Sequence, residues 1–274
     1  MMGLSRRAGF AILALAVLAF AILTEGGALR AQSTDPAAGK ELAPSGHLRV
    51  GVYAGSPTSQ VTDSDTKENH GVTYDLGKEF AARLDVPVEY VTFPRVADVI
   101  DAIKQGKVDF TVTNATPVRA RDINFSKILL MVELGYLVPA NSPIIRPEQL
   151  DGPGIRIGVS KGGTSERVLA EKYKNAKIIS TESVPDAINS LREGVFDVYA
   201  TNKSILFQMA RSLPGARVLD GNWGAEHMAI AVPKGREAAQ GLLDNFVRDV
   251  QSSGRLQQIE TVAGLKGAVS AEKD

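Results

Sequence analysis

The sequence predicts an α/β protein made of two similar halves, and two observations lead to this prediction. The first is an internal repeat in which residues 96–114 match residues 184–202, with seven identical residues at a constant offset of 88. The second is a pair of matching apolar segments, Leu-Arg-Val-Gly-Val at 48–52 and Ile-Arg-Ile-Gly-Val at 155–159. Each half is therefore predicted to follow the order strand, helix, strand, helix, strand, and to form a parallel-type sheet flanked by helices.

Each copy of the repeat is predicted to be a helix followed by a strand. Apolar residues in both copies follow the i, i+3, i+4, i+7 spacing of one buried helix face. Gly106 and its twin Gly194 come just after the last apolar position, where a left-handed residue commonly ends a helix. Strands are predicted at residues 48–52, 108–113, 155–159 and 196–201, and further helices at 74–84, 165–173 and 240–259.

The first 46 residues predict an export signal and a leader. Arg6 and Arg7 precede an uncharged apolar run, and small residues up to Ala31 provide a cleavage site. This pattern is typical of a secretory signal peptide, here at residues 1–31. The apolar run of about 16 residues is short for a membrane span, which needs roughly 20, and an uncleaved anchor is the alternative. Residues 32–46 predict a flexible leader.

Composition excludes several functional classes. The chain of 274 residues carries 31 basic and 31 acidic residues, a balance that predicts no nucleic-acid-binding surface. It has no cysteine, which excludes disulfides, thiolate metal sites and a cysteine nucleophile. Its three histidines are too scattered for metal-ligand spacing. We therefore expect no cofactor, no metal site and no catalytic residue.

The segments that follow the predicted strands are the main functional signal. They are rich in Gly, Ser, Thr, Asn, Arg and Lys, whereas the strands are apolar. In open α/β sheets, ligands bind beyond the carboxyl ends of the strands. Arg119 can hold a carboxylate with two parallel hydrogen bonds. Thr164 follows two glycines at the start of a helix, where free N–H groups favour an anion. A surface arginine and a plain helix cap are the alternatives.

A set of short segments spread over the chain matches a known family. They are Leu-Arg-Val-Gly-Val at 48–52, Gly-Val-Thr-Tyr-Asp-Leu at 71–76, Gly-Lys-Val-Asp at 106–109, Thr-Pro-Val-Arg-Ala at 116–120, Asn-Phe-Ser at 124–126, Ile-Gly-Val-Ser-Lys-Gly-Gly-Thr-Ser-Glu at 157–166 and Met-Ala-Ile-Ala-Val-Pro-Lys-Gly at 228–235. Together they resemble the extracellular solute-binding proteins of ABC importers, family 3, of the amino-acid-binding type. The resemblance covers nearly all of residues 47–265.

The resemblance implies a two-lobe, periplasmic-binding-protein type II architecture. Lobe 1 is expected at residues 47–134 and 229–270, and lobe 2 at residues 135–228, joined by two crossover strands near 134–138 and 227–232. It further implies a monomer in the periplasm that binds a small-molecule solute between the lobes and closes by hinge motion. The implied partner is an ABC permease in the inner membrane.

The resemblance also implies roles for individual residues. In the family, the arginine that matches Arg119 clamps the ligand carboxylate, the residue that matches Asn114 adds a hydrogen bond, and the threonine that matches Thr164 binds from the second lobe. Further ligand contacts are expected from Gly163 and, at the end of the first strand, from Tyr53 and Ser56.

The chain departs from the family pattern in ways that bear on the ligand. Asn202, which we also expect at the site, stands where the family carries an aspartate for the ligand's ammonium group. Arg95 adds positive charge. Of the two places where the family often carries aromatic walls, the first is the ring-free segment 54–58 here and the second is Val96. These changes predict a ligand more anionic than a common amino acid, such as a dicarboxylate, an oxo-acid or a phosphonate. The alternative is an amino acid, if Glu133, Glu226 or Asp75 replaces the missing aspartate.

The sequence leaves two other classes of function as alternatives to transport. The same fold hosts cyclohexadienyl dehydratases, which need a general acid aimed into the cleft. The sequence shows no carboxylate at a strand end that clearly fills this role, so we expect no enzymatic activity. The third hypothesis is a ligand-sensing module that docks to a membrane partner.

Overall fold

The computed structural model describes residues 36–269, which belong to one compact unit. The predicted signal peptide and the first four residues of the predicted leader lie outside this range. Of the helices within the range, none is long and apolar enough to cross a membrane. The same residues contain no cluster of acidic and histidine side chains suited to a metal ion.

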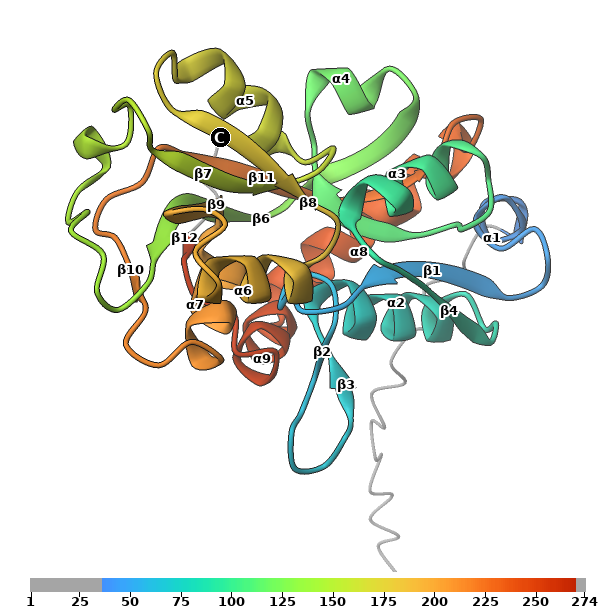
Figure 1. Cartoon of the computed structure of the whole chain (residues 1–274). Coiled ribbons are helices and arrows are strands. Elements are labelled where there is room, and N and C mark those ends of the chain that lie inside the picture. Colours follow the sequence, from blue (N-terminus) through green and yellow to red (C-terminus); the bar gives the residue numbers. More distant parts are fainter. Residues whose placement is uncertain (1–35, 270–274) are drawn as a thin grey trace, which may run out of the picture. The chain divides into compact units, whose positions relative to one another are not determined.

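The first half of the chain forms a small parallel sheet with helices on both faces (Figure 1). Its elements are β1 (Leu48–Tyr53), α2 (Val72–Arg83), β4 (Val88–Phe93), α3 (Val96–Lys104) and β5 (Thr111–Asn114). Neighbouring residues of β1 face opposite ways, because side chains alternate along a strand. Val50 packs against Gly77 of α2, whereas Gly51 faces Val99 of α3. The two helices therefore cover opposite faces of β1.

The second half repeats the same order of elements. They are β7 (Arg156–Ser160), α5 (Thr164–Lys172), β8 (Lys177–Thr181), α6 (Val184–Arg192) and β9 (Val198–Asn202), followed by α7 (Lys203–Arg211). β7 pairs in parallel with both β8 and β9. The repeat found in the sequence is therefore also a repeat of structure.

Twin ion pairs hold the third strand of each half to the first. Asp109, just before β5, accepts hydrogen bonds from the backbone N and the guanidinium of Arg49, with Nε at 2.7 Å. Asp197, just before β9, accepts the same set from Arg156, with Nη2 at 2.6 Å. The two aspartates therefore have matching structural roles in the two halves.

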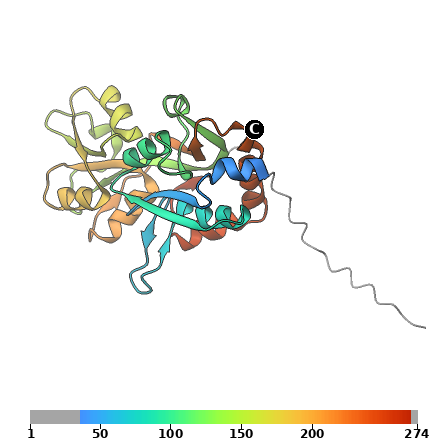
Figure 2. The same cartoon turned by 90° about the vertical axis from the view of Figure 1, so that its right-hand side faces the viewer.

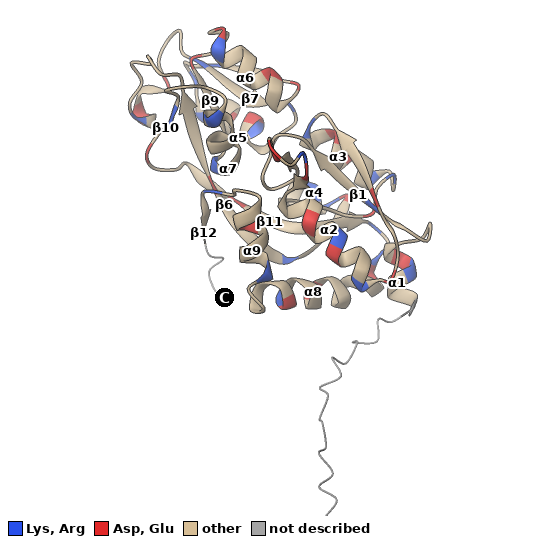
Figure 3. Ribbon diagram, turned by 90° about the horizontal axis from the view of Figure 1, so that it is seen from below, with Lys and Arg blue, Asp and Glu red and all other residues tan. Residues whose placement is uncertain are grey.

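Two long strands join the halves. β6 (Ile123–Val138) and β11 (Gly224–Pro233) pair antiparallel with each other, β11 also pairs with β5, and β6 also pairs with β9. Leu130 and Val132 of β6 pack in a core with β1, whereas Tyr136 and Val138 pack in a core with β7. We call the elements around the first core lobe 1 and those around the second lobe 2. Figure 3 shows β6 and β11 running between the two groups. The predicted two-lobe α/β fold with two crossover strands is confirmed.

The remaining elements add to the two lobes. They are α1 (Pro36–Leu42), β2 (Val61–Thr62), β3 (Asn69–His70), α4 (Pro117–Ala120), β10 (Arg217–Val218), α8 (Gln240–Ser252), α9 (Arg255–Val262), β12 (Ala268–Val269) and two 3-10 turns at Pro147–Gln149 and Glu237–Ala239. β2 and β3 pair as a hairpin that projects from lobe 1 (Figure 1 and Figure 2).

Two predictions need correction. The stretch 36–46 is not a flexible leader, because α1 buries Ala38 and Leu42 in the core of lobe 1. These apolar residues are four positions apart and so share one face of a helix. The single helix predicted at 240–259 is instead two helices, α8 and α9. The chain breaks at Gly254, whose φ of 75° is left-handed and is readily adopted by glycine.

Candidate ligand-binding site

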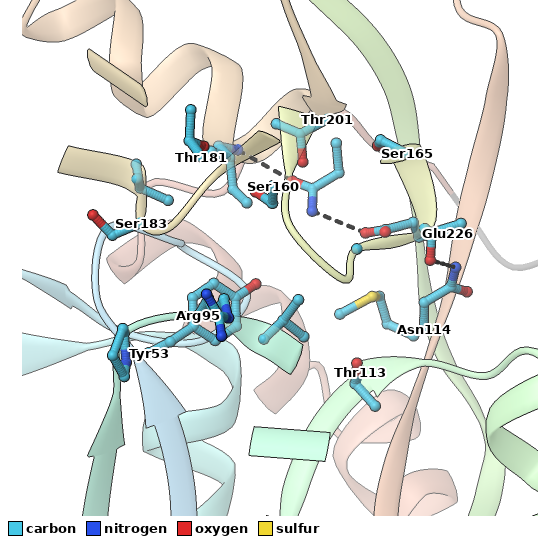
Figure 4. Close-up of a pocket in the computed structure, with 18 of the residues that line it drawn as sticks. Tyr53, Arg95, Thr113, Asn114, Ser160, Ser165, Thr181, Ser183, Thr201 and Glu226 are labelled. Atoms are coloured by element: carbon cyan, nitrogen blue, oxygen red, sulfur yellow. Dashed lines mark hydrogen bonds between the residues drawn. The ribbon is translucent and has the colours of Figure 1, made fainter. Parts of the chain in front are cut away.

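A cavity of about 40 Å³ lies between the two lobes, at the carboxyl ends of their strands (Figure 4). Seven of the eight residues predicted for the site line it: Tyr53, Arg95, Asn114, Arg119, Gly163, Thr164 and Asn202. The twin strand ends that the repeat pointed to, at residues 113–114 and 201–202, both face this cavity. The fold therefore brings together most of the residues that the sequence singled out.

Arg119 is held against the end of β5. It lies on α4, which starts with Pro117 and is capped by Thr116, whose side chain accepts a hydrogen bond from the Arg119 backbone N at 3.3 Å. Nη1 of Arg119 donates to Thr113 Oγ1 at 2.8 Å and to the Asn114 carbonyl oxygen at 3.2 Å. Burial lowers the pKa of Arg119, while the nearby Glu226 opposes this effect. Nη2 and Nε make no hydrogen bond within residues 36–269, which leaves them available to a ligand carboxylate.

Asn114 links the two lobes at the start of α5. Its Nδ2 donates to Thr164 Oγ1 at 3.2 Å, and its Oδ1 accepts from the backbone N of His227 at 2.9 Å. Gly163 is the N-cap of α5, and its own N–H is used by the Ser160 carbonyl at 3.0 Å. The first residues of α5 after this cap, Thr164 and Ser165, line the cavity, and the free N–H groups at the start of a helix favour an anion.

Asn202 lines the cavity and also caps a helix. Its Oδ1 caps α7, accepting from the Ile205 backbone N at 3.1 Å and from Ser204 Oγ at 2.8 Å. Its Nδ2 donates to Glu226 Oε2 at 2.9 Å. The amide thus orients a carboxylate instead of supplying one.

Glu226 is the site residue that the sequence could only name as one of three candidates. Of these three, Glu226 alone lines the cavity. Glu133 pairs with Lys203 at 2.6 Å, and Asp75 accepts from the backbone N of Gly71 at 2.9 Å at the start of α2. Burial raises the pKa of Glu226, while its hydrogen bond from Asn202 and the charge of Arg119 lower it. The cavity therefore holds a cation and a carboxyl group.

The two predicted contacts from the first strand behave differently. Tyr53 lines the cavity, and its hydroxyl donates to Ser56 Oγ at 3.3 Å. Ser56 is fully buried and shares a hydrogen bond with Thr58 Oγ1 at 2.8 Å. The expectation of a direct ligand contact from Ser56 needs correction, because the chain turns after Tyr53 and places Ser56 behind it.

Arg95 lines the cavity from lobe 1 and reaches across to lobe 2. Its Nη2 pairs with Asp98 at 3.1 Å, and its Nη1 pairs with Glu182 of lobe 2. Lys161 joins the same group, with its Nζ 2.6 Å from Glu182 Oε1. Nε of Arg95 is buried and has no hydrogen-bond partner among the described residues.

The arrangement of two lobes around a polar cavity agrees with a family comparison. A model described as bacterial extracellular solute-binding proteins, family 3, matches residues 48–262. The chain belongs to this family. Among other members, the ABC transporter glutamine-binding protein GlnH of Bacillus subtilis is 26% identical over 196 residues, which cover 70% of this chain and 71% of the relative.

Solved structures that resemble this chain share the fold of type II periplasmic binding proteins. The ancestral amino acid-binding protein AncCDT-1, a precursor of cyclohexadienyl dehydratase, superposes with a TM-score of 0.71 at 25% identity, covering 82% of this chain and 98% of that one. A solute receptor for L-cysteine from Neisseria gonorrhoeae gives a TM-score of 0.71 at 25% identity, covering 82% and 92%.

Proposed function

We propose that this solute-binding protein holds a zwitterionic amino acid in the cavity between its lobes and delivers it to an ABC permease of the inner membrane. The observation that carries the proposal is the presence of Arg119 and Glu226 in one cavity. An α-amino acid carries a carboxylate and an ammonium group, and these match a guanidinium and a carboxylate. The relatives named for glutamine and L-cysteine support the same class of ligand.

This proposal revises the ligand expected from the sequence. Asn202 in place of an aspartate predicted a more anionic solute, because one negative charge was counted as lost. Glu226 restores that charge from β11 and is oriented by Asn202 itself. We also propose that the protein is a monomer exported to the periplasm by its signal peptide, and that the ligand's carboxylate bonds to Arg119 and the N-terminus of α5.

A calorimetric titration with matched ligands tests the proposal. After denaturation and refolding to remove any bound solute, the exported protein is titrated with amino acids and with analogues that lack either the amine or the carboxylate. We expect amino acids to bind and both analogues to bind far more weakly. Glu226→Gln should weaken amino-acid binding by about 2–5 kcal/mol, as for a buried hydrogen-bonded charge pair. Tighter binding of dicarboxylates or oxo-acids would contradict the proposal.

A matched variant controls for the loss of charge. Glu133→Gln removes a carboxylate from β6, which pairs with β11, but Glu133 binds Lys203 and Asn222 and does not line the cavity. We expect its amino-acid affinity to equal that of the wild type. An equal loss in both variants would mean that net charge, not the site, determines affinity.

A dehydratase is the second candidate, because Glu226 could act as a general acid. Its pKa is raised by burial, and a carboxyl group that stays protonated can donate to a leaving hydroxyl. Incubation with a hydroxylated cyclohexadienyl acid distinguishes the two functions. The absorbance of an aromatic product, lost in Glu226→Gln, would favour the enzyme, whereas its absence together with amino-acid binding would favour transport.

A further inference from the structure

We infer that Arg95 recognises the side chain of the bound amino acid, and that this side chain is short, uncharged and ends in a hydrogen-bond acceptor. The inference rests on the proposed function, in which Arg119 and Glu226 hold the carboxylate and ammonium groups. Figure 4 shows Arg95 and Tyr53 on the opposite side of the cavity from Glu226 and Asn114. A ligand held at Glu226 would therefore point its side chain toward Arg95.

The hydrogen-bonding state of Arg95 indicates an acceptor on the ligand. Two of its three guanidinium nitrogens are paired, Nη2 with Asp98 and Nη1 with Glu182, but the buried Nε has no partner within residues 36–269. A buried donor without a partner is rare in folded proteins and calls for a specific explanation. A ligand oxygen or sulfur beside Nε would supply the missing acceptor.

The charges around Arg95 favour a neutral acceptor over a carboxylate. Arg95 and Lys161 carry two positive charges, and Asp98 and Glu182 carry two negative charges, all within one group of ion pairs. The group is therefore balanced before any ligand binds. A ligand carboxylate would add a negative charge near two carboxylates, whereas a hydroxyl, thiol or amide would not.

The size of the cavity limits the side chain. The space open to the centres of water-sized groups is only about 40 Å³, so the cavity is narrow. Val184 lines the cavity from lobe 2 and lies close to Gly55 of lobe 1, where an added Cβ would be 3.0 Å from the Val184 Cβ, so the two lobes already approach each other there. The hydroxyls of Ser160, Thr181 and Ser183 line the same end. Serine, cysteine and asparagine fit these limits better than leucine, lysine or aromatic residues.

The test compares side-chain preference in two variants of the exported protein. Wild type is titrated by calorimetry with alanine, serine, cysteine, asparagine, aspartate and leucine. We expect at least one of serine, cysteine and asparagine to bind about tenfold tighter than alanine, as one hydrogen bond allows, and aspartate and leucine to bind more weakly than alanine. Arg95→Lys keeps the positive charge but lacks Nε–H. It should bring the affinity for the preferred ligand to within about threefold of the affinity for alanine, in addition to any common shift that the altered ion pairs with Asp98 and Glu182 give to all affinities.

Glu182→Gln is the control that separates ligand recognition from the contact between lobes. It removes the ion pair between Arg95 and lobe 2 but retains Nε. We expect it to shift all affinities by one common factor and to leave the preference over alanine intact. The inference is overturned if Arg95→Lys keeps the wild-type preference, if Glu182→Gln loses it equally, or if aspartate or leucine binds tightest. Failure of every amino acid to bind the wild type would instead refute the proposed function.

Discussion

Replacing Asp109 by alanine should destabilise the protein far more than replacing its twin, Asp197. The side chain of Asp109 is fully buried and bonds to two arginines. Arg49 donates to it at 2.7 Å, and Arg236, with only 10% of its side chain exposed, donates at 2.7 Å. Without Asp109, both guanidinium groups lose their carboxylate in or near the core. Removing one partner of a buried ion pair costs about 3–5 kcal/mol.

Asp197 provides a control with the same fold and sequence context. It is 32% exposed, and its single partner, Arg156, is 39% exposed. An exposed ion pair contributes only about 0.2–1 kcal/mol. Both variants also lose one hydrogen bond from a backbone N, of Arg49 or of Arg156, and this loss cancels in the comparison. We therefore expect the free energy of unfolding of Asp109→Ala to be about 2–5 kcal/mol below that of Asp197→Ala. For 150–250 residues this corresponds to a difference in Tm of roughly 4–20 °C.

Urea unfolding followed by circular dichroism, with calorimetry for Tm, measures both variants without ligand. Equal losses of stability in the two variants would refute the reasoning from burial. The pH dependence gives a second check. Burial alone would raise the pKa of Asp109, but hydrogen bonds from Arg49 and Arg236 outweigh it and hold the pKa below its usual value. The stability that Asp109 contributes is therefore present above about pH 4, the unfolded value, and is lost as pH falls through the folded pKa.

Two predictions concern the binding site. Arg119→Ala should weaken amino-acid binding by about 2–5 kcal/mol, because the ligand carboxylate would then lose its guanidinium partner. Calorimetry measures this change, and unchanged affinity with an intact circular dichroism spectrum would refute the role of Arg119. Amino-acid binding should also release protons, since burial raises the pKa of Glu226 in the free protein and a ligand ammonium would lower it. Affinity should therefore rise with pH until Glu226 is ionised. Titrations in buffers of different ionisation enthalpy measure the release, which Glu226→Gln should abolish.

The sequence predicted most of the site because the repeat marks corresponding strand ends. Thr113 and Asn114 match Thr201 and Asn202, and parallel strands carry such residues to the same edge of their sheets. Arg119 follows the end of β5 at Asn114 within a few residues, and Thr164 follows the end of β7 at Ser160 in the same way, so local spacing was enough to find them.

Glu226 could not be selected in the same way. It lies at neither a repeated strand end nor a helix start, and it reaches the cavity only because β11 pairs with β6, where Glu226 faces Val132 across the ladder. That register depends on contacts between residues about 90 positions apart in the chain. Glu133 and Asp75 had equal standing in the sequence, and only the fold shows that both have other partners. A signal for α1 did exist, in the apolar pair Ala38 and Leu42, but its small and polar neighbours favoured a leader.

The path of the chain through β6 and β11 has a consequence for how the protein is made. The core of lobe 1 combines residues 38–132 with residues 228–259, whereas the cores of lobe 2 use only residues 136–223. The segment synthesised first therefore lacks β11 and α8 until the last fifth of the chain has emerged. Contacts between distant parts of a chain form slowly, because the intervening loop must close first. Lobe 2 is encoded by the middle of the chain and can complete its core while β1 and α2 still expose apolar surface. The part of the chain that is synthesised first therefore completes its core last.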